Sequence, residues 1–289
     1  MKILMVHDNY NWDSYSIVRS ACDILKERED VEYIEIGSPK AEGMGKGDYA
    51  FIYSSRFVLL NIEYEALKEK GVTVVTFGLS DPNMFSEERL TYCDLYCTND
   101  LNIYREYKDK YNVYHFQPGV DLTRFKKIDA PKDIDVLFIG TLKHSYIPYR
   151  KTYLLQLKKD IEGFRGFGEG WDRFLKGEEL VLGYNRAYLN IDISTKVSSL
   201  SNARILQAAA CGTPTLTLKR EDVLQCFKDG KEILTYGGGY DELLRAVRAV
   251  MKGKTRLAEI GEAARQRCLK DHDMRKRVND LIKYLEGNK

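Results

Sequence analysis

The sequence lacks any apolar stretch long enough to cross a membrane. Its first apolar run, residues 3–6, ends at His7 and is too short for the apolar region of a signal peptide. No small-residue cleavage site follows this run. We therefore expect a cytoplasmic protein.

A marked excess of either charge is also missing. Lys and Arg number 45 against 43 Asp and Glu, so the formal net charge at pH 7 is only +2. A domain that evolved to neutralise nucleic-acid phosphates is usually more basic than this. The composition therefore does not predict nucleic-acid binding, although it does not exclude it.

Cysteine pairs with the spacing of a metal site are absent. The six cysteines are scattered, and Cys93 and Cys97 lack the second close pair that a zinc site would need. We predict free thiols in a reducing compartment and no metal site. Short tandem repeats and low-complexity tracts are missing as well.

The chain does contain enough apolar material for two domains. It has 289 residues, of which 44% are hydrophobic and 30% charged, and this length fits two compact α/β domains better than one core. A polar stretch after Asp121 reads as a linker. We predict an N-terminal domain over residues 1–125, a C-terminal domain over 126–270, and a helix over 271–289 that packs back on the N-terminal domain.

Short apolar runs alternate with helical patterns along the whole chain. This alternation predicts doubly wound parallel sheets, in which ligands bind at the carboxyl ends of the strands. The expected strands cover residues 3–6, 31–36, 49–53, 72–77, 94–98, 135–139, 188–193 and 215–218. The expected helices cover residues 14–29, 62–70, 151–159 and 201–210, with a glycine-rich stretch over 163–170 and only helices after residue 218.

The predicted helix over residues 201–210 has a well-marked start. Ser201 and Asn202 are good caps, and Gly212 provides a stop signal. The unpaired N–H groups and positive dipole end of such a helix suit a diphosphate, and Arg204 in the first turn could add a bidentate contact. Gln207, one turn later, would point the same way. A surface helix with Arg204 in a salt bridge explains these residues equally well.

Several motifs occur in an order that resembles the C-terminal domain of a GT-B glycosyltransferase. They are Gly140-Thr141 after a strand, Arg150, Gly166-Phe167-Gly168, Leu189-Asn190-Ile191, and Arg204 followed by residues 209–214. Pro118-Gly119-Val120-Asp121 is similar to the interdomain signature of the glycosyltransferase group 1 superfamily. Within that superfamily the CgeB-type, spore-maturation-protein-like group is the most similar. The resemblance covers most of the chain from Gln117 onward, whereas the N-terminal half matches in pattern only.

The resemblance implies two Rossmann-like doubly wound domains that face each other across a cleft. It implies transfer of a sugar from a UDP-, GDP- or dTDP-sugar to an acceptor hydroxyl on a glycan, a protein or a nucleic acid, without a required metal. The implied donor-binding residues are Gly140, Thr141, Arg150, Ser201, Asn202, Arg204 and Gln207. Glycine at position 140 would let the backbone approach a phosphate closely, and the alternative for Arg150 is an exposed cation at a helix start.

Asp81, Asp8 and His7 are the candidate catalytic residues on the acceptor side. Each follows or ends a predicted strand, where a carboxylate or imidazole could take the proton of the acceptor hydroxyl. Aspartates at such positions also serve as helix caps.

The chain departs from many relatives in one respect. They have glutamates at the position of Gln207 and near Ser199, and this sequence has neither. Glutamine can still bind the ribose hydroxyls as donor and acceptor, but the stereochemical outcome is not predicted. A catalytically inactive nucleotide-sugar-binding protein, an epimerase or hydrolase on the same fold, and a DNA-modifying glucosyltransferase remain alternatives.

Overall fold

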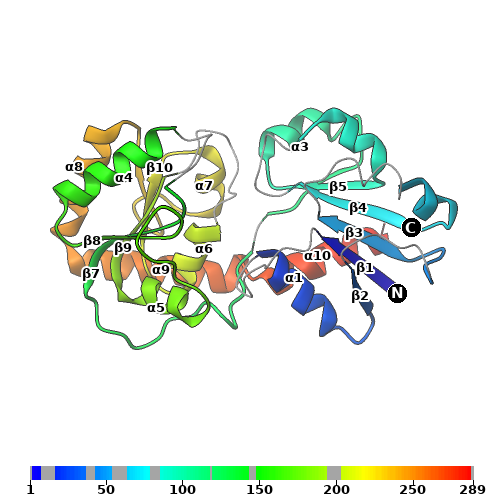
Figure 1. Ribbon diagram of the computed structural model, residues 1–289, viewed down its shortest axis with the longest axis horizontal. Coiled ribbons are helices and arrows are strands. Elements are labelled where there is room, and N and C mark those ends of the chain that lie inside the picture. Colours follow the sequence, from blue (N-terminus) through cyan, green and yellow to red (C-terminus); the bar gives the residue numbers. More distant parts are fainter. Residues whose placement is uncertain are drawn as a thin grey trace. The chain divides into compact units, whose positions relative to one another are not determined.

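The computed structural model describes residues 2–7, 17–36, 43–53, 64–78, 85–117, 119–142, 148–193 and 203–287. The chain divides into two compact units (Figure 1). Unit 1 contains the described residues up to 117 together with those from Arg275 onward, and unit 2 contains the described residues from Gly119 to Met274.

Unit 1 is built on a six-stranded parallel sheet with the order β2-β1-β3-β4-β5-β6. The first strand therefore lies between the second and the third, which is the order of a doubly wound sheet. The strands are β1 (Lys2–His7), β2 (Glu32–Ile36), β3 (Tyr49–Tyr53), β4 (Thr73–Gly78), β5 (Leu95–Thr98) and β6 (Val113–His115).

The inner strands β1, β3 and β4 carry buried apolar residues on both faces, as expected of strands that are covered on both sides. Leu4, Ile52 and Val74 lie on one face and form a core with Leu67 from a helical segment over residues 64–69. The remaining elements are α1 (Ile17–Lys26), the 3₁₀ helix η2 (Glu87–Tyr92) and α3 (Leu101–Tyr107). Asp100 fixes the start of α3, because its carboxylate accepts the backbone N–H groups of residues 102 and 103 at 2.8 and 3.4 Å.

The last helix, α10 (Met274–Gly287), packs on unit 1 although unit 2 precedes it in the sequence. The Tyr49 hydroxyl donates to the carbonyl of Leu285 at 3.4 Å, and the rings of Tyr114 and Tyr284 are 4.7 Å apart. Unit 1 is therefore made from two separate parts of the chain.

Unit 2 has a five-stranded parallel sheet with the order β11-β10-β9-β7-β8. Counted along the chain, its first strand again lies between the second and the third. The strands are β7 (Ile134–Ile139), β8 (Phe164–Phe167), β9 (Ala187–Asp192), β10 (Thr215–Leu218) and β11 (Leu234–Tyr236).

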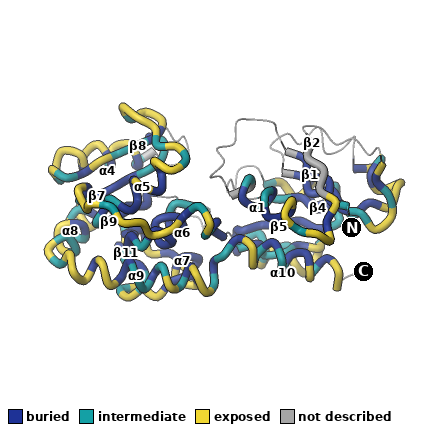
Figure 2. The backbone as a smooth tube through the Cα atoms, turned by 90° about the horizontal axis from the view of Figure 1, so that it is seen from below, coloured by how far each residue is buried: buried dark blue, intermediate teal, exposed yellow. Residues whose placement is uncertain are grey.

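Helices cover both faces of the second sheet (Figure 1). On one face, Phe138 and Leu189 share a core with Leu154 of α4 (Pro148–Asp160) and Leu243 of α8 (Tyr240–Met251). The other face carries α5 (Glu178–Arg186), α6 (Ala203–Ala210) and α9 (Lys254–Asp271), and α7 (Glu221–Cys226) follows β10. Figure 2 shows the strands buried beneath helices whose outer positions are exposed.

The two parallel sheets confirm the predicted α/β class. Strands β3 and β10 have the predicted bounds, and all six cysteines are free, as predicted. The expectation of only helices after residue 218 was wrong, because residues 234–236 pair with β10 as an edge strand. Strands β6 and β8 were also not predicted, and β8 lies inside the glycine-rich stretch.

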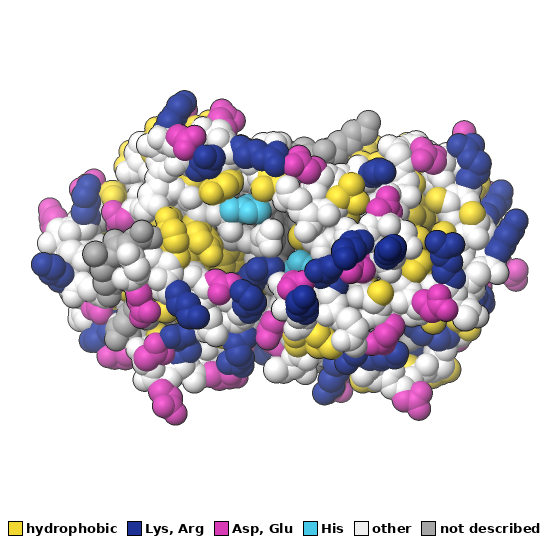
Figure 3. Space-filling view, turned by 180° about the vertical axis from the view of Figure 1, so that it is seen from behind, with side chains coloured by type: hydrophobic (Ala, Val, Ile, Leu, Met, Phe, Trp, Pro, Cys, Tyr) yellow, Lys and Arg dark blue, Asp and Glu magenta, His cyan; other side chains and the backbone are white. Residues whose placement is uncertain are grey.

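Two further features concern the hydropathy of the helices and the charge of the surface. Within the described part of the chain, no helix is both long and apolar enough to cross a membrane. Basic and acidic side chains are interspersed on the face shown in Figure 3, in keeping with the small net charge.

Candidate functional site

The candidate site lies where the strand order of unit 2 reverses direction. Strand β7 is followed by β8 on one side of it, and β9, on its other side, is followed by β10. The connections that leave the carboxyl ends of β7 and β9 therefore run in opposite directions. In open α/β sheets this switch point is where ligands bind. Gly140 follows β7, Asp192 ends β9, and Arg204 lies in the first turn of α6.

Asp192 is the centre of the polar contacts at this point. It is fully buried, and its Oδ1 accepts hydrogen bonds from Nε and Nη2 of Arg204 at 3.1 and 2.9 Å. Its Oδ2 accepts from the Thr217 hydroxyl at 3.2 Å. The Arg204 guanidinium also lies 5.4 Å from the ring centre of Phe138. The salt-bridge alternative for Arg204 is thus present, yet 17% of the side chain stays exposed and open to a ligand.

Arg150 brings a second guanidinium to the same place. Its side chain is buried and Nε donates to the carbonyl of Ile193 at 2.8 Å, so it is not the exposed cation of the alternative interpretation. Burial lowers the pKa of Arg150 to about 10, the Arg204 charge acts in the same direction, and Asp192 opposes both. The group is still a cation at neutral pH. Two guanidinium groups therefore share the influence of one buried carboxylate, which favours an anionic ligand.

Gly140 leaves room for the Arg204 side chain. Its φ is 154°, and a Cβ at this position would lie 2.4 Å from Nη1 of Arg204. A Cβ on Gly168 would likewise lie 2.5 Å from the Gly140 carbonyl oxygen. Glycine at position 140 therefore has a second role besides the predicted approach to a phosphate, because it lets the guanidinium of Arg204 pack against the backbone.

Thr141 and Gln207 are engaged with neighbouring side chains. The Thr141 hydroxyl donates to the carboxylate of Glu169 at 3.1 Å. Gln207 is buried, and its Oε1 accepts from the hydroxyl of Tyr184 on α5 at 3.2 Å. The glutamine oxygen that was predicted to accept from a ribose hydroxyl already has one protein donor.

Of the other predicted residues, the structure describes one. Ser201, Asn202, Asp8 and Asp81 lie outside the described residues, and their predicted roles stay predictions. His7 is the last residue of β1, which puts its backbone at the switch point of the unit 1 sheet, between β2 and β3.

Two features of the site were missed in the sequence. Asp192 is the main one, and its signal was a carboxylate at the end of an apolar strand. The second is a small pocket beside the carboxyl ends of β10 and β11, with a volume of about 140 Å³. It is lined by Tyr149, Tyr153, Leu218, Tyr236, Gly238 and Gly239. Among the described residues, no group of three or more His, Cys, Asp or Glu side chains is placed to hold a metal ion.

Comparisons with known proteins bear on the class of this protein. Residues 150–283 match the family model described as glycosyl transferase-like. Among curated proteins the sequence has no match.

Solved structures give a more extensive likeness, although sequence identity is low. HepE from Anabaena in complex with UDP and glucose is 13% identical with a TM-score of 0.73, over 99% of both chains. Sucrose-phosphate synthase from Thermosynechococcus elongatus is 10% identical with a TM-score of 0.70, over 100% of both chains. The pneumococcal O-GlcNAc transferase GtfA in complex with UDP and GlcNAc is 12% identical with a TM-score of 0.61, over 84% of this chain and 57% of that chain.

The family match and the shared fold together support a glycosyltransferase of the GT-B type, as the motifs predicted. The CgeB-type group is a finer assignment and stays a prediction.

Proposed function

We propose that this glycosyltransferase moves a sugar from a nucleoside-diphosphate sugar, bound by unit 2, to an acceptor hydroxyl. The observation that carries the proposal is the cluster of Arg150, Asp192 and Arg204 at the switch point of the unit 2 sheet. We propose a UDP-sugar as the donor, because HepE is similar in fold along its whole length and was solved with UDP-glucose.

The arginine cluster would act mainly on the leaving group. As the bond to the sugar breaks, negative charge accumulates on the nucleoside diphosphate, and groups fixed in advance around that charge lower the barrier. Arg204 and Arg150 would supply two such charges, and Ser201 and Asn202 at the start of α6 would supply hydrogen bonds. Gly140 and Thr141 would form the wall of this site after β7. The proposed neutralisation by two guanidinium groups requires no metal ion.

The acceptor would bind unit 1 across a cleft that faces the donor. The unit 1 sheet has the same strand order, so its own switch point lies after β1, where His7 ends the strand and Asp8 follows. One of His7, Asp8 and Asp81 would take the proton of the acceptor hydroxyl. We propose a cytoplasmic enzyme of the CgeB-type group, given the six free thiols, with a glycan, protein or nucleic-acid acceptor.

Replacing Arg204 tests the proposal. Arg204→Ala should lower both sugar transfer and donor hydrolysis at least tenfold, about 1.4 kcal/mol of transition-state stabilisation. Both rates are measured, together with UDP affinity by calorimetry. Arg173→Ala, which removes an exposed arginine of unit 2, serves as the control.

Arg204→Ala also leaves the buried carboxylate of Asp192 without its arginine. In other proteins, removing one partner of a buried ion pair costs about 3–5 kcal/mol of stability. A second variant therefore separates a loss of UDP binding from a loss of stability. Asp192→Asn combined with Arg204→Ala removes that carboxylate's charge and should restore the melting temperature. The double variant should still fail to bind UDP. Wild-type UDP affinity in this folded variant would show that the helix start is not the donor site.

A further inference from the structure

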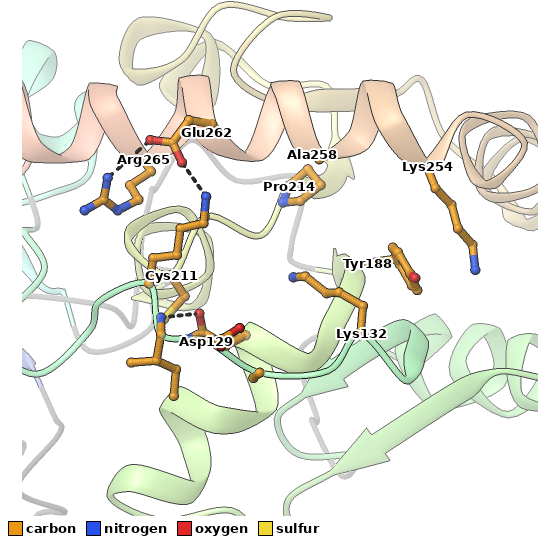
Figure 4. Close-up of a pocket in the computed structure, with 14 residues that line it drawn as sticks. Asp129, Lys132, Tyr188, Cys211, Pro214, Lys254, Ala258, Glu262 and Arg265 are labelled. Carbon is orange, nitrogen blue, oxygen red and sulfur yellow. Dashed lines mark hydrogen bonds and ion pairs between the residues drawn. The ribbon is translucent and has the colours of Figure 1, made fainter.

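A second cavity lies in unit 2 at the opposite edge of the sheet. It has a volume of about 670 Å³ and is bounded by the extended segment over residues 127–132, the starts of β9 and β10, and helix α9 (Figure 4). Tyr188 of this cavity precedes Asp192 by four residues in β9, a separation of about 13 Å along an extended strand. The cavity is therefore distinct from the proposed donor site, and its volume is in the range of small-molecule sites.

Cations dominate the charged lining of this cavity. Four cationic side chains, Lys127, Lys132, Lys254 and Arg265, face two carboxylates, Asp129 and Glu262. Glu262 already accepts from Nζ of Lys127 at 2.8 Å and from Nη1 of Arg265 at 3.2 Å. Lys254 pairs with Asp135 outside the lining, so three cations remain beside the two carboxylates, an excess of one positive charge.

The remaining wall combines an aromatic ring with apolar side chains. Nζ of Lys254 lies 3.9 Å from the ring centre of Tyr188 and 2.9 Å from Oδ1 of Asp135. Ile128 and Pro214 also contribute to the lining. The cavity therefore offers an apolar wall beside its cations, which suits an organic anion better than a bare ion.

Lys132 has no carboxylate partner among the residues that the structure describes. Its Nζ donates to the Ala187 carbonyl at 2.7 Å, and in Figure 4 the amine extends into the space between the extended segment and α9. Burial lowers the pKa of Lys132 to about 8, and the charge of Lys127 acts in the same direction. An ammonium group has three donors, so two remain for a ligand. An anion would offset both the burial and the repulsion.

Arg265 presents a second unused donor. Its Nε is buried and has no acceptor within the described chain. A buried donor without a partner costs free energy, and a shift of the Arg265 side chain toward an anion in the cavity would remove that cost.

Capping of α6 does not explain these cations. Lysine and arginine side chains often neutralise the carbonyl groups at a helix C-terminus, and α6 ends beside the cavity. Backbone N–H groups of residues 211, 212 and 213 already bond the carbonyls of residues 207, 209 and 208. None of the bonds described for the four cations goes to an α6 carbonyl.

We propose that this cavity binds a small phosphorylated molecule, with Lys132, Lys127 and Arg265 holding the phosphate and the wall at Tyr188 and Pro214 holding the organic part. Three phosphate oxygens can accept from several cationic donors at once, which suits a site where one carboxylate is shared between two cations.

Hydrogen exchange of the intact protein tests the site without reference to the donor. Inorganic pyrophosphate, a hexose phosphate and a nucleoside monophosphate are added separately, each with and without saturating UDP. At least one organic phosphate should protect peptides covering residues 126–133 and 254–266, with UDP present or absent. Protection confined to residues 139–142 and 203–210, and abolished by UDP, would place the phosphate in the donor site and overturn the proposal.

Matched substitutions complete the test. Lys132→Met and, separately, Lys127→Met should each weaken phosphate binding at least tenfold, whereas Lys252→Met removes an exposed lysine of the same unit and should change it less than twofold. Equal losses in all three variants would reveal a general charge effect. Tighter binding of a short acidic peptide than of any phosphate would assign the surface to a protein partner, and either result would overturn the proposal.

Discussion

At the level of single residues, Gly140 decides whether Arg204 keeps its place. A Cβ in Gly140→Ala would lie 2.4 Å from Nη1 of Arg204 and would displace the guanidinium from the end of β7. We expect UDP affinity, measured by calorimetry, to fall at least tenfold. The free energy of unfolding should also fall by about 1–3 kcal/mol, because alanine is strained at a φ of 154°.

Gly230→Ala separates these two effects. Gly230 also has a positive φ, 71°, but a Cβ there meets no atom within 4 Å. This variant should lose stability by a similar mechanism and keep wild-type UDP affinity. If both alanine variants bind UDP equally well, the packing of Arg204 against Gly140 has no part in donor binding.

The residues of the site differ in how far the sequence reveals them. Arg204 could be found because a capped helix start predicts an anion site from local pattern alone. Asp192 is harder to find, because a carboxylate at a strand end is a weak signal until the fold brings Arg204 and Thr217 to it. The burial of Arg150 also depends on contacts from other elements.

At the level of elements, the interior strands were predictable, whereas three of the four edge strands, β6, β8 and β11, were not. β3 is a short apolar run, and β10 alternates two β-branched threonines with two leucines; both patterns are typical of buried strands. β11 has three residues and is a strand only because it pairs with β10, and the glycines around β8 hide its pattern. Edge strands owe their structure to a partner that a local window does not contain.

The contact between β6 and α3 makes unit 1 sensitive to acid. The ring of His115, which ends β6, lies 5.4 Å from the ring of Tyr104 on α3. Burial lowers the pKa of His115 below its usual value in the folded state, while a backbone hydrogen bond with Asn99 opposes the shift. The unfolded chain therefore binds a proton first as the pH falls below about 6.5. The free energy of unfolding should therefore decrease as the pH falls from about 6.5 toward the lower pKa that His115 has in the folded protein.

Urea unfolding at pH 7.5 and pH 5.5 measures this effect. His115→Gln removes the titrating group and should reduce the loss of stability between the two values. Tyr104→Leu disturbs the same contact but keeps the imidazole, so it should lower stability at both pH values and retain the wild-type pH dependence. A His115→Gln protein with the full wild-type pH dependence would show that other groups cause it.

At the level of the whole molecule, the described residues of unit 2 all lie between Gly119 and Met274, whereas those of unit 1 come from both ends of the chain. The stretch from Gly119 to Met274 begins and ends at the same place, because the Val120 N–H donates to the His272 carbonyl at 2.9 Å and the Met274 N–H to the Val120 carbonyl at 3.1 Å. His272 itself is buried against Phe227, with a ring separation of 5.1 Å. Unit 1 needs α10, which follows unit 2 in the chain.

This arrangement predicts different behaviour for the two halves expressed alone. Residues 119–274 contain a complete sheet with both faces covered and all the described donor-binding residues, so they should unfold cooperatively and bind UDP within about tenfold of the intact chain. They should not transfer sugar, since the proposed base and acceptor site belong to unit 1. Circular dichroism, calorimetry and a transfer assay measure the three properties.

Residues 1–118 alone should fail to fold, because the surface that α10 covers, including the bond from Tyr49 to Leu285, would be exposed. Joining residues 1–118 to residues 275–289 through a flexible linker restores that helix and should restore cooperative unfolding. A folded 1–118 fragment would make α10 dispensable to unit 1. A folded 119–274 fragment without UDP affinity would show that the donor needs residues from both halves of the chain, and the donor site proposed for unit 2 would then be incomplete.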